Sequence, residues 1–262
     1  MPSWSQTEIE RCVELVKVKP LEIKWMKRPP RPVQLAAVMA DPKAIKFIRH
    51  TDADIQLIAV EKLPNHGLSL IRNPHPIAQL KACQLYGRNL KLIKNPSYEM
   101  YLAAVKQDGS MIEFISEQTE ELQMSALETS NWSFHYFKNP SKRVRLQAIR
   151  KNPRNISEIR KPTVEEQILA VTLDPYSFSS ISTPCVEAQV IAVRQCSDLY
   201  SRIRNPAESV SVEYVKHGPH FIKYVKNPSK AVKWSSIMAH PESIQFITDA
   251  SEAMIATAKI CS

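Results

Sequence analysis

Residues 92–115 read LIKNPSYEMYLAAVKQDGSMIEFI, and the first five letters have close relatives elsewhere in the chain. LIRNP occurs at 70–74, YFKNP at 136–140, RIRNP at 202–206 and YVKNP at 224–228. In each of them an apolar residue stands directly before a basic one, and we take this apolar residue as the anchor from which positions are counted. Recurrence at a fixed interval is typical of tandem repeat proteins.

The anchors follow one another at intervals of 22 residues, with a single step of 23. They are Met26, Ile48, Ile71, Ile93, Ile115, Phe137, Ile159, Ile181, Ile203, Val225 and Ile247. Positions −3 and +9 are also apolar in all eleven units, as Leu90 and Leu102 show for the quoted stretch. Three aligned apolar columns do not arise by chance, so the pattern predicts about eleven repeats of 22 residues.

Asparagine, proline and glycine divide each repeat into two helices. Asn precedes Pro in five repeats, as in Asn95-Pro96, and this pair is predicted to supply the N-cap and first residue of a helix. That helix should be about ten residues long and end at a second Pro or Gly near position +16, such as Gly109. A second helix of about seven residues then leads to the next anchor.

A single pair of such helices exposes too much apolar surface to be stable alone, so neighbouring pairs must stack. The sequence therefore predicts an all-α fold, an α-solenoid of about eleven two-helix repeats that form a curved or superhelical array. Residues 1–262 are predicted to be one domain, with an N-terminal cap helix in 1–20, repeats over 21–250 and a C-terminal capping helix in 251–262.

The quoted unit resembles the short helical repeats, with a KNPS…QLAAVKQNG-like core, of uncharacterised proteins from large bacteriophages and other viruses. The resemblance extends from about residue 20 to 258 and is best in the units anchored at Ile93, Phe137 and Val225. It implies a helical-repeat fold, no enzymatic activity and no assigned site residues. It further implies a phage or viral protein that acts in the host cytoplasm, on host machinery or host defence.

The composition argues against several classes of protein. The chain has four glycines, nineteen prolines and no GxGxxG or GxxxxGK motif, which disfavours a nucleotide-binding fold, and no cofactor is expected. No export signal or apolar run of membrane-spanning length is visible. Five cysteines without CxxC spacing indicate reduced thiols in the cytoplasm. His217 and His220 lack further ligands at suitable spacing, and no catalytic motif is present, so neither a metal site nor an enzyme is expected.

A basic residue follows the anchor in eight repeats: Lys27, Arg49, Arg72, Lys94, Lys138, Arg160, Arg204 and Lys226. With a net charge of +9 and a pI near 9.3, this row suggests either an anion track for nucleic acid or a solvated, protein-facing edge. From Gln107 to Phe137 there is no Lys or Arg but six acidic residues, which interrupts such a track. Ser116, Ser182 and Thr248 replace the basic residue at intervals of 66, through block duplication or a superhelix of about three repeats per turn.

Two more columns are candidates for binding. Glutamine at position +8 favours a structural ladder that satisfies loop backbone groups, with readout of bases or peptides as the alternative. These glutamines are Gln34, Gln56, Gln79, Gln123, Gln167 and Gln189. Aromatic residues at position −1 suggest either base stacking or, more consistent with their place beside two core columns, partial burial. They are Trp25, Phe47, Phe114, Tyr136, Tyr224 and Phe246.

The sequence thus predicts a non-catalytic helical-repeat protein that binds a macromolecule along an extended surface. A host or viral protein is the predicted partner, as for a host-takeover or anti-defence adaptor. A nucleic-acid-binding solenoid that uses the basic row, or a structural component of a virion, is the alternative. Neither a membrane nor a small-molecule substrate is expected.

Overall fold

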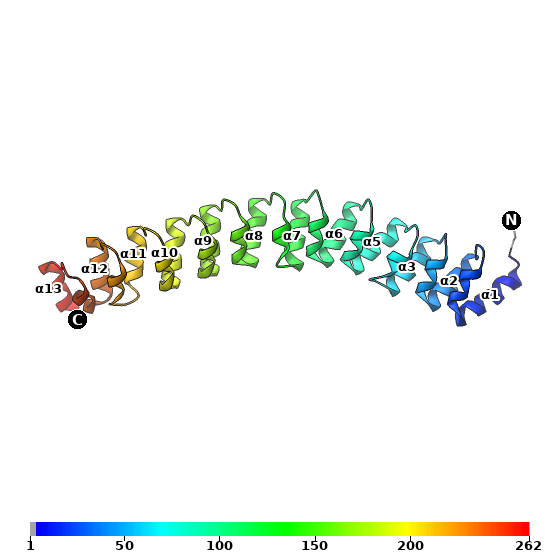
Figure 1. Cartoon of the computed structure of the whole chain (residues 1–262), viewed down its shortest axis with the longest axis horizontal. Coiled ribbons are helices and arrows are strands. Elements are labelled where there is room, and N and C mark those ends of the chain that lie inside the picture. The colour runs from blue at the N-terminus through cyan, green and yellow to red at the C-terminus, as the bar shows by residue number, and fades with distance from the viewer. Residues whose placement is uncertain (1–3, 262) are drawn as a thin grey trace. The chain divides into compact units, whose positions relative to one another are not determined.

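The computed structural model describes residues 4–261, and every regular element in that range is a helix. The residues form two compact units, one that ends at Ser141 and one that begins at Lys142. Within each unit, long α-helices alternate with short helices, and each long helix contacts the long helices before and after it (Figure 1). The predicted all-α, α-solenoid fold is therefore confirmed.

The first unit opens with a helix inside the segment predicted as the N-terminal cap. Its elements are α1 (Gln6–Val18), η1 (Pro20–Trp25), α2 (Arg31–Ala40), η2 (Pro42–Phe47), α3 (Ala53–Lys62), α4 (Gly67–Leu70), α5 (Pro76–Leu85), η3 (Gly87–Leu92), α6 (Tyr98–Gln107), η4 (Gly109–Phe114), α7 (Glu120–Thr129) and η5 (Ser133–Tyr136). The α elements other than α4 are the long helices, and the η elements are 3₁₀-helices.

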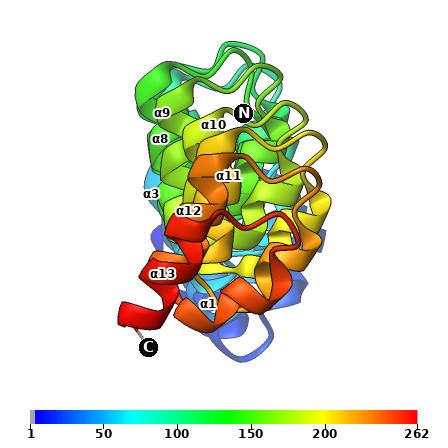
Figure 2. The same ribbon diagram turned by 90° about the vertical axis from the view of Figure 1, so that its left-hand side faces the viewer.

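The second unit repeats the same alternation and closes with a helix in the segment predicted as the C-terminal cap. Its elements are α8 (Lys142–Lys151), η6 (Pro153–Glu158), α9 (Val164–Leu173), η7 (Pro175–Ser180), α10 (Val186–Gln195), η8 (Ser197–Arg202), α11 (Glu208–Val215), η9 (Phe221–Tyr224), α12 (Lys230–Ala239), η10 (Pro241–Phe246) and α13 (Glu252–Cys261). Seen end-on, the long helices of a unit form one layer and the short helices with their loops form the other (Figure 2).

The long helices begin two residues later than the Asn-Pro pattern predicts. Ser97 is the N-cap of α6, and its hydroxyl accepts a hydrogen bond from Met100 N at 3.4 Å. Asn139, Asn205 and Asn227 instead adopt the left-handed conformation, with φ of 48°, 52° and 48°. Asparagine tolerates this conformation better than other residues with a Cβ. The prediction of an Asn cap with Pro at the first helical position is wrong, since the pair forms the turn before the helix.

A single residue joins most of the long helices to the short helix that follows, and in the quoted repeat that residue is Asp108. Its N–H donates to Ala104 O at 2.8 Å to close α6, while its Oδ1 accepts from Ser110 N at 3.0 Å to open η4. Gly109 lies against the next repeat, where an added Cβ would collide with Ala126 O. At this repeat the corner therefore uses an aspartate cap and a residue without a Cβ, whereas Tyr86 and Cys196 occupy the same corner in other repeats without a side-chain cap.

The three-residue spacing between the apolar columns at −3 and 0 matches the geometry of the short helix. A 3₁₀-helix has three residues per turn, so residues three apart lie above one another. The N–H of every anchor donates to the carbonyl at position −3, as Ile93 N does to Leu90 O at 3.1 Å. Position −3 is buried in ten of the eleven repeats, and the anchor is buried in seven and half-buried in four.

The long helix buries positions +7 and +11 in all eleven repeats and position +12 in ten. Alanine fills position +11 in most repeats and lies with no exposed surface at Ala104. The +9 column, predicted to share the core, is half-buried in ten repeats and exposed at Ala256. At about 100° per residue, position +9 lies to the side of the buried face, so its side chain packs between neighbouring long helices.

Candidate binding surfaces

The anchor residue directs its two neighbours outward. All eleven anchors adopt an extended backbone, with φ −101° and ψ 121° at Ile93 as an example. Side chains alternate between opposite sides of an extended chain, so an inward anchor places positions −1 and +1 together on the outer side. Each repeat thus presents a pair of outward residues, such as Leu92 and Lys94, which are both exposed.

The basic row lies where the sequence places it. All eight residues of the row are exposed, five of them in the first unit and three in the second. Lys138 donates from Nζ to Ile115 O at 3.2 Å. Among residues 4–261 the ion pairs involve other side chains, for example Arg31 with Asp52 and Lys81 with Glu61, so the row keeps its positive charge uncompensated.

Position −1 carries a second row that the sequence interpretation placed partly in the core. In the first unit all six of its residues are apolar: Trp25, Phe47, Leu70, Leu92, Phe114 and Tyr136. Trp25 is 74% exposed, Leu92 53%, Phe114 47% and Phe47 43%. Partial burial holds for Tyr136 and Phe246 but not for Trp25 or for Tyr224, which is 63% exposed. The rings follow an inward −3 residue by two positions, which turns them away from the core.

The second unit does not continue this apolar row. Its residues at position −1 are Glu158, Ser180, Arg202, Tyr224 and Phe246. Three polar residues therefore stand where the first unit has aromatic or aliphatic side chains. A row of exposed apolar side chains is thus a property of the first unit, and it could have been found in the sequence by reading position −1 for all apolar residues instead of aromatic ones.

Lysine side chains lie over several of these rings. Lys91 Nζ is 4.1 Å from the centre of the Phe114 ring in the next repeat, and Lys223 Nζ is 4.0 Å from that of Phe246. Lys24 Nζ lies 4.9 Å from the centre of its neighbour Trp25. The first two contacts join residues of successive repeats, which shows that position −2 of one repeat and position −1 of the next share the same outer surface.

The glutamine column is used to hold loops. Gln56 donates from Nε2 to Thr51 O and to Asn73 O, both at 3.3 Å, and its Oε1 accepts from His75 N at 2.7 Å. Gln167 donates to Pro162 O at 3.1 Å and accepts from Cys185 N at 2.7 Å. Both amides are buried, and each links its own loop to the loop of the next repeat. These contacts are the ones that the structural interpretation of the column predicts.

The other four glutamines of the column also donate hydrogen bonds to backbone carbonyls of the loops. Gln34, Gln79 and Gln189 donate to the carbonyls of Pro29, Pro74 and Pro184 at 2.7, 3.1 and 2.9 Å. Gln123 donates to Lys138 O at 2.9 Å and is buried. Because their amide groups are already engaged with backbone groups, this column is a weaker candidate for ligand contact than the two outward rows.

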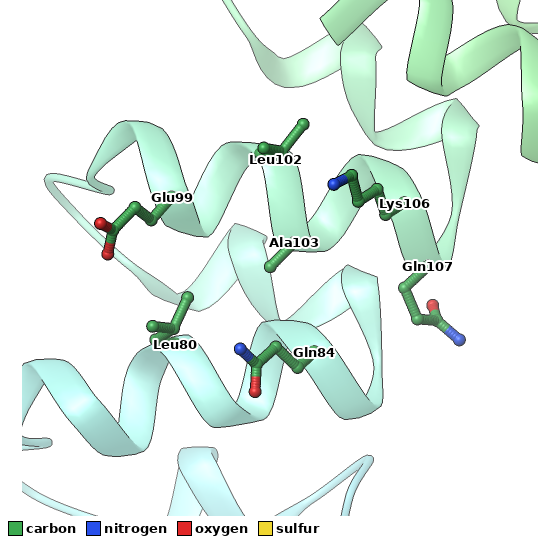
Figure 3. A pocket seen from close by; sticks show the side chains of 7 residues that line it. All are labelled: Leu80, Gln84, Glu99, Leu102, Ala103, Lys106 and Gln107. Atoms are coloured by element: carbon green, nitrogen blue, oxygen red, sulfur yellow. The ribbon is translucent and has the colours of Figure 1, made fainter.

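A shallow groove lies on the opposite layer, between α5 and α6 of the first unit (Figure 3). It has a volume of about 510 Å³, and the +9 residues Leu80 and Leu102 with Ala103 form its apolar part. Gln84, Glu99 and Lys106 surround this part with polar groups. The seventh lining residue, Gln107, accepts a hydrogen bond from Gly87 N at 2.8 Å and is engaged in the fold.

No group of three or more His, Cys, Asp or Glu side chains in the described part of the chain is arranged to hold a metal ion. His217 and His220 both lie near Phe221, with ring centres 6.0 and 4.6 Å away and the rings tilted against each other. All five cysteines are free thiols, and burial raises the pKa of Cys83 to about 11.

Comparison with known proteins gives no match among family models, curated proteins or solved structures. A bilayer-spanning helix needs about 20 mostly apolar residues, and none of the helices between residues 4 and 261 meets that requirement.

Proposed function

We propose that this protein is a non-catalytic helical-repeat binding protein whose partner is another protein. The observation that carries the proposal is the outward row at position −1 of the first unit, where six successive repeats present an apolar side chain to solvent or near it. Exposed apolar side chains that recur along one surface mark an interaction site, whereas scattered single ones do not. Stacked repeats supply such a surface in extended form, one side chain per repeat.

The resemblance to viral repeat proteins supports a particular kind of partner and a biological role. It supports a host or viral protein as the partner and a role as an adaptor in host takeover or against host defence. The test is affinity purification of the tagged protein from infected or expressing cells, with and without nuclease, followed by mass spectrometry. A protein that is retained after nuclease treatment supports the proposal, while recovery of proteins only through nucleic acid contradicts it.

The second candidate function is nucleic-acid binding, and the uncompensated charge of the basic row favours it. Neutralising phosphates releases counterions, so the affinity of such a protein falls steeply with salt. Replacing five residues of the row by serine, which the chain itself carries at Ser116 and Ser182, should flatten that dependence by several units if the row binds phosphates. The variant is Lys94→Ser, Lys138→Ser, Arg160→Ser, Arg204→Ser and Lys226→Ser. We expect no tight binding at about 150 mM salt for either protein.

A further inference from the structure

We propose that the first unit binds an extended, acidic protein segment that carries apolar side chains, and that it does so on the outer surface of its first four short helices. This proposal rests on the proposed function and names the surface and the chemistry of the partner. The surface, called here the basic-apolar face, comprises the outward residues of four segments. They are 21–28, 43–50, 66–73 and 88–95.

The four segments lie next to one another in the folded unit. η1 contacts η2, η2 contacts α4, and α4 contacts η3. Their anchors, Met26, Ile48, Ile71 and Ile93, point inward, so the residues on both sides of each anchor face outward together. The face is therefore a continuous surface with one copy of the same pattern per repeat.

The charge of this face is almost entirely positive. The four segments contain ten Lys or Arg residues and one acidic residue, Glu22. Arg88 forms an ion pair with Asp108 at 3.5 Å. The four members of the basic row on this face make no ion pair with the described residues: Lys27, Arg49, Arg72 and Lys94. Such a surface attracts an anionic partner and repels a basic one.

Exposed apolar side chains lie between these charges. Trp25 is 74% exposed, Phe47 43% and Leu92 53%, and Leu70 is half-buried. Trp, Tyr and Arg are enriched among the few interface residues that carry most of the binding energy, and this face presents Trp25 beside several arginines and lysines. The partner must therefore offer apolar groups as well as negative charge, which a uniformly acidic polymer does not.

The pattern suits a polypeptide better than a nucleic acid or a membrane. Leu70 and Leu92 have no ring on which a base would stack, and Lys24 already lies over the ring of Trp25. Leu70 is half-buried and Phe47 exposes 43% of its surface, so these two side chains offer little apolar area for insertion between lipids. Helices pack about 8 to 10 Å apart, and an extended chain rises about 3.3 Å per residue. A segment of about twelve residues, three per repeat, therefore spans the face.

The test is a selection of ligands on the 262-residue protein from a displayed library of random peptides about twelve residues long. Random single-stranded oligonucleotides and vesicles of phosphatidylcholine with phosphatidylserine are separate probes. We expect enriched peptides that combine Asp or Glu with aromatic or aliphatic residues. Their affinity should fall on the order of tenfold in each of two variants of the face. One is Lys27→Ser, Arg49→Ser, Arg72→Ser and Lys94→Ser, and the other is Trp25→Ser, Phe47→Ser and Leu92→Ser.

Two control variants change the same kinds of residue elsewhere and should leave the affinity of those peptides within about twofold of the parent's. The first removes the same charge from the second unit: Arg160→Ser, Lys161→Ser, Arg204→Ser and Lys226→Ser. The second removes three exposed apolar residues from long helices: Met39→Ser, Ile77→Ser and Leu173→Ser. Thermal unfolding followed by circular dichroism checks that each variant folds. If the triple apolar variant does not fold, Trp25→Ser alone replaces it in the binding measurement.

Each outcome decides the proposal. Acidic, apolar peptides that lose affinity only in the two face variants support it. Peptides that lose affinity in the long-helix control overturn the choice of surface, and enrichment of oligonucleotides or binding to vesicles without peptide enrichment overturns the class of ligand. A selection that yields no ligand overturns the proposal as well. If a partner protein is still retained after nuclease treatment in the purification experiment, the proposed function holds even though this proposal fails. The two proposals can therefore fail separately.

Discussion

Arg145 Nε donates a hydrogen bond of 2.7 Å to Glu166 Oε1 across two successive repeats of the second unit. Glu166 has no exposed surface and occupies position +7, which is apolar in the other ten repeats. Arg145 occupies position +8, where six repeats have glutamine. Thr163 N also donates to Glu166 Oε2 at 2.7 Å. An ion pair with a fully buried carboxylate therefore replaces the apolar residue that the other repeats have at +7 and the glutamine that six of them have at +8.

We expect Arg145→Ala to lower the free energy of unfolding by about 3 to 5 kcal/mol, because it leaves a buried carboxylate without its charge partner. Arg145→Gln with Glu166→Val restores the residue types of the other repeats. This double variant should lie within about 1 kcal/mol of the parent, since a buried ion pair is seldom better than well-packed apolar residues. Urea unfolding followed by circular dichroism measures both. A double variant as unstable as Arg145→Ala would show that glutamine and valine cannot replace the ion pair at these positions.

The glutamine column should be worth more where its amide joins two repeats. Gln56→Ala removes the acceptor of His75 N and leaves part-buried backbone groups of two loops without their partner, which should cost about 1 to 2 kcal/mol. Gln79→Ala loses a half-exposed amide that bonds only to Pro74 O, and about 1 kcal/mol or less is expected. The comparison uses urea midpoints of the two variants. Equal losses at the two sites would show that the link between repeats adds nothing.

The cysteines should react with alkylating reagents in the order of their exposure. Cys83 has no exposed surface, and its burial raises the thiol pKa to about 11, so little thiolate exists at neutral pH. Cys261 is exposed and should be labelled first. Mass spectrometry of the protein treated with iodoacetamide, native and in urea, locates each label. Labelling of Cys83 in the native protein at the rate seen in urea would show that position +12 of its repeat is open to solvent.

Acid should weaken the second unit through Glu213. The hydrogen bond from Arg194, at 2.9 Å, is the main cause that holds the pKa of Glu213 below its ordinary 4.5, partial burial opposes it, and Lys216 adds to the lowering. A carboxyl whose pKa is lower in the folded state stabilises the fold above 4.5, and this stability is lost as the pH falls through the folded pKa.

Glu213→Gln should therefore be less stable than the parent near neutral pH, with a difference that shrinks as the pH falls below 4.5. Arg194→Gln keeps the carboxyl but removes its main partner, so its stability should be lost closer to 4.5 than that of the parent. Thermal unfolding in a series of buffers measures these profiles. A difference between parent and Glu213→Gln that stays constant across the acid range would show that this carboxyl makes no contribution that depends on pH.

The repeat period by itself determined the fold class, the number of repeats and the inward columns at the anchor and position −3. Burial of the apolar columns stabilises every repeat. The same apolar residues are therefore required eleven times, and their recurrence can be recognised in the sequence. The exposed basic row was equally predictable, because a charged residue next to a buried one along an extended chain must turn outward. The glutamine ladder followed from the need of loop backbone groups for partners.

Only the tertiary structure decided what depends on the distance between neighbouring elements. The +9 leucines are half-buried because the next long helix covers one side of them. The left-handed φ of Asn205 and Asn227 is not shared by Asn73 and Asn95, so the Asn-Pro pattern alone does not predict it. The exposure of Trp25 and Leu92 and the reach of Gln56 to Asn73 O and His75 N likewise depend on how the next repeat is placed. A sequence column records whether a residue type recurs, whereas the extent of its burial is set by neighbours that lie about 22 residues away.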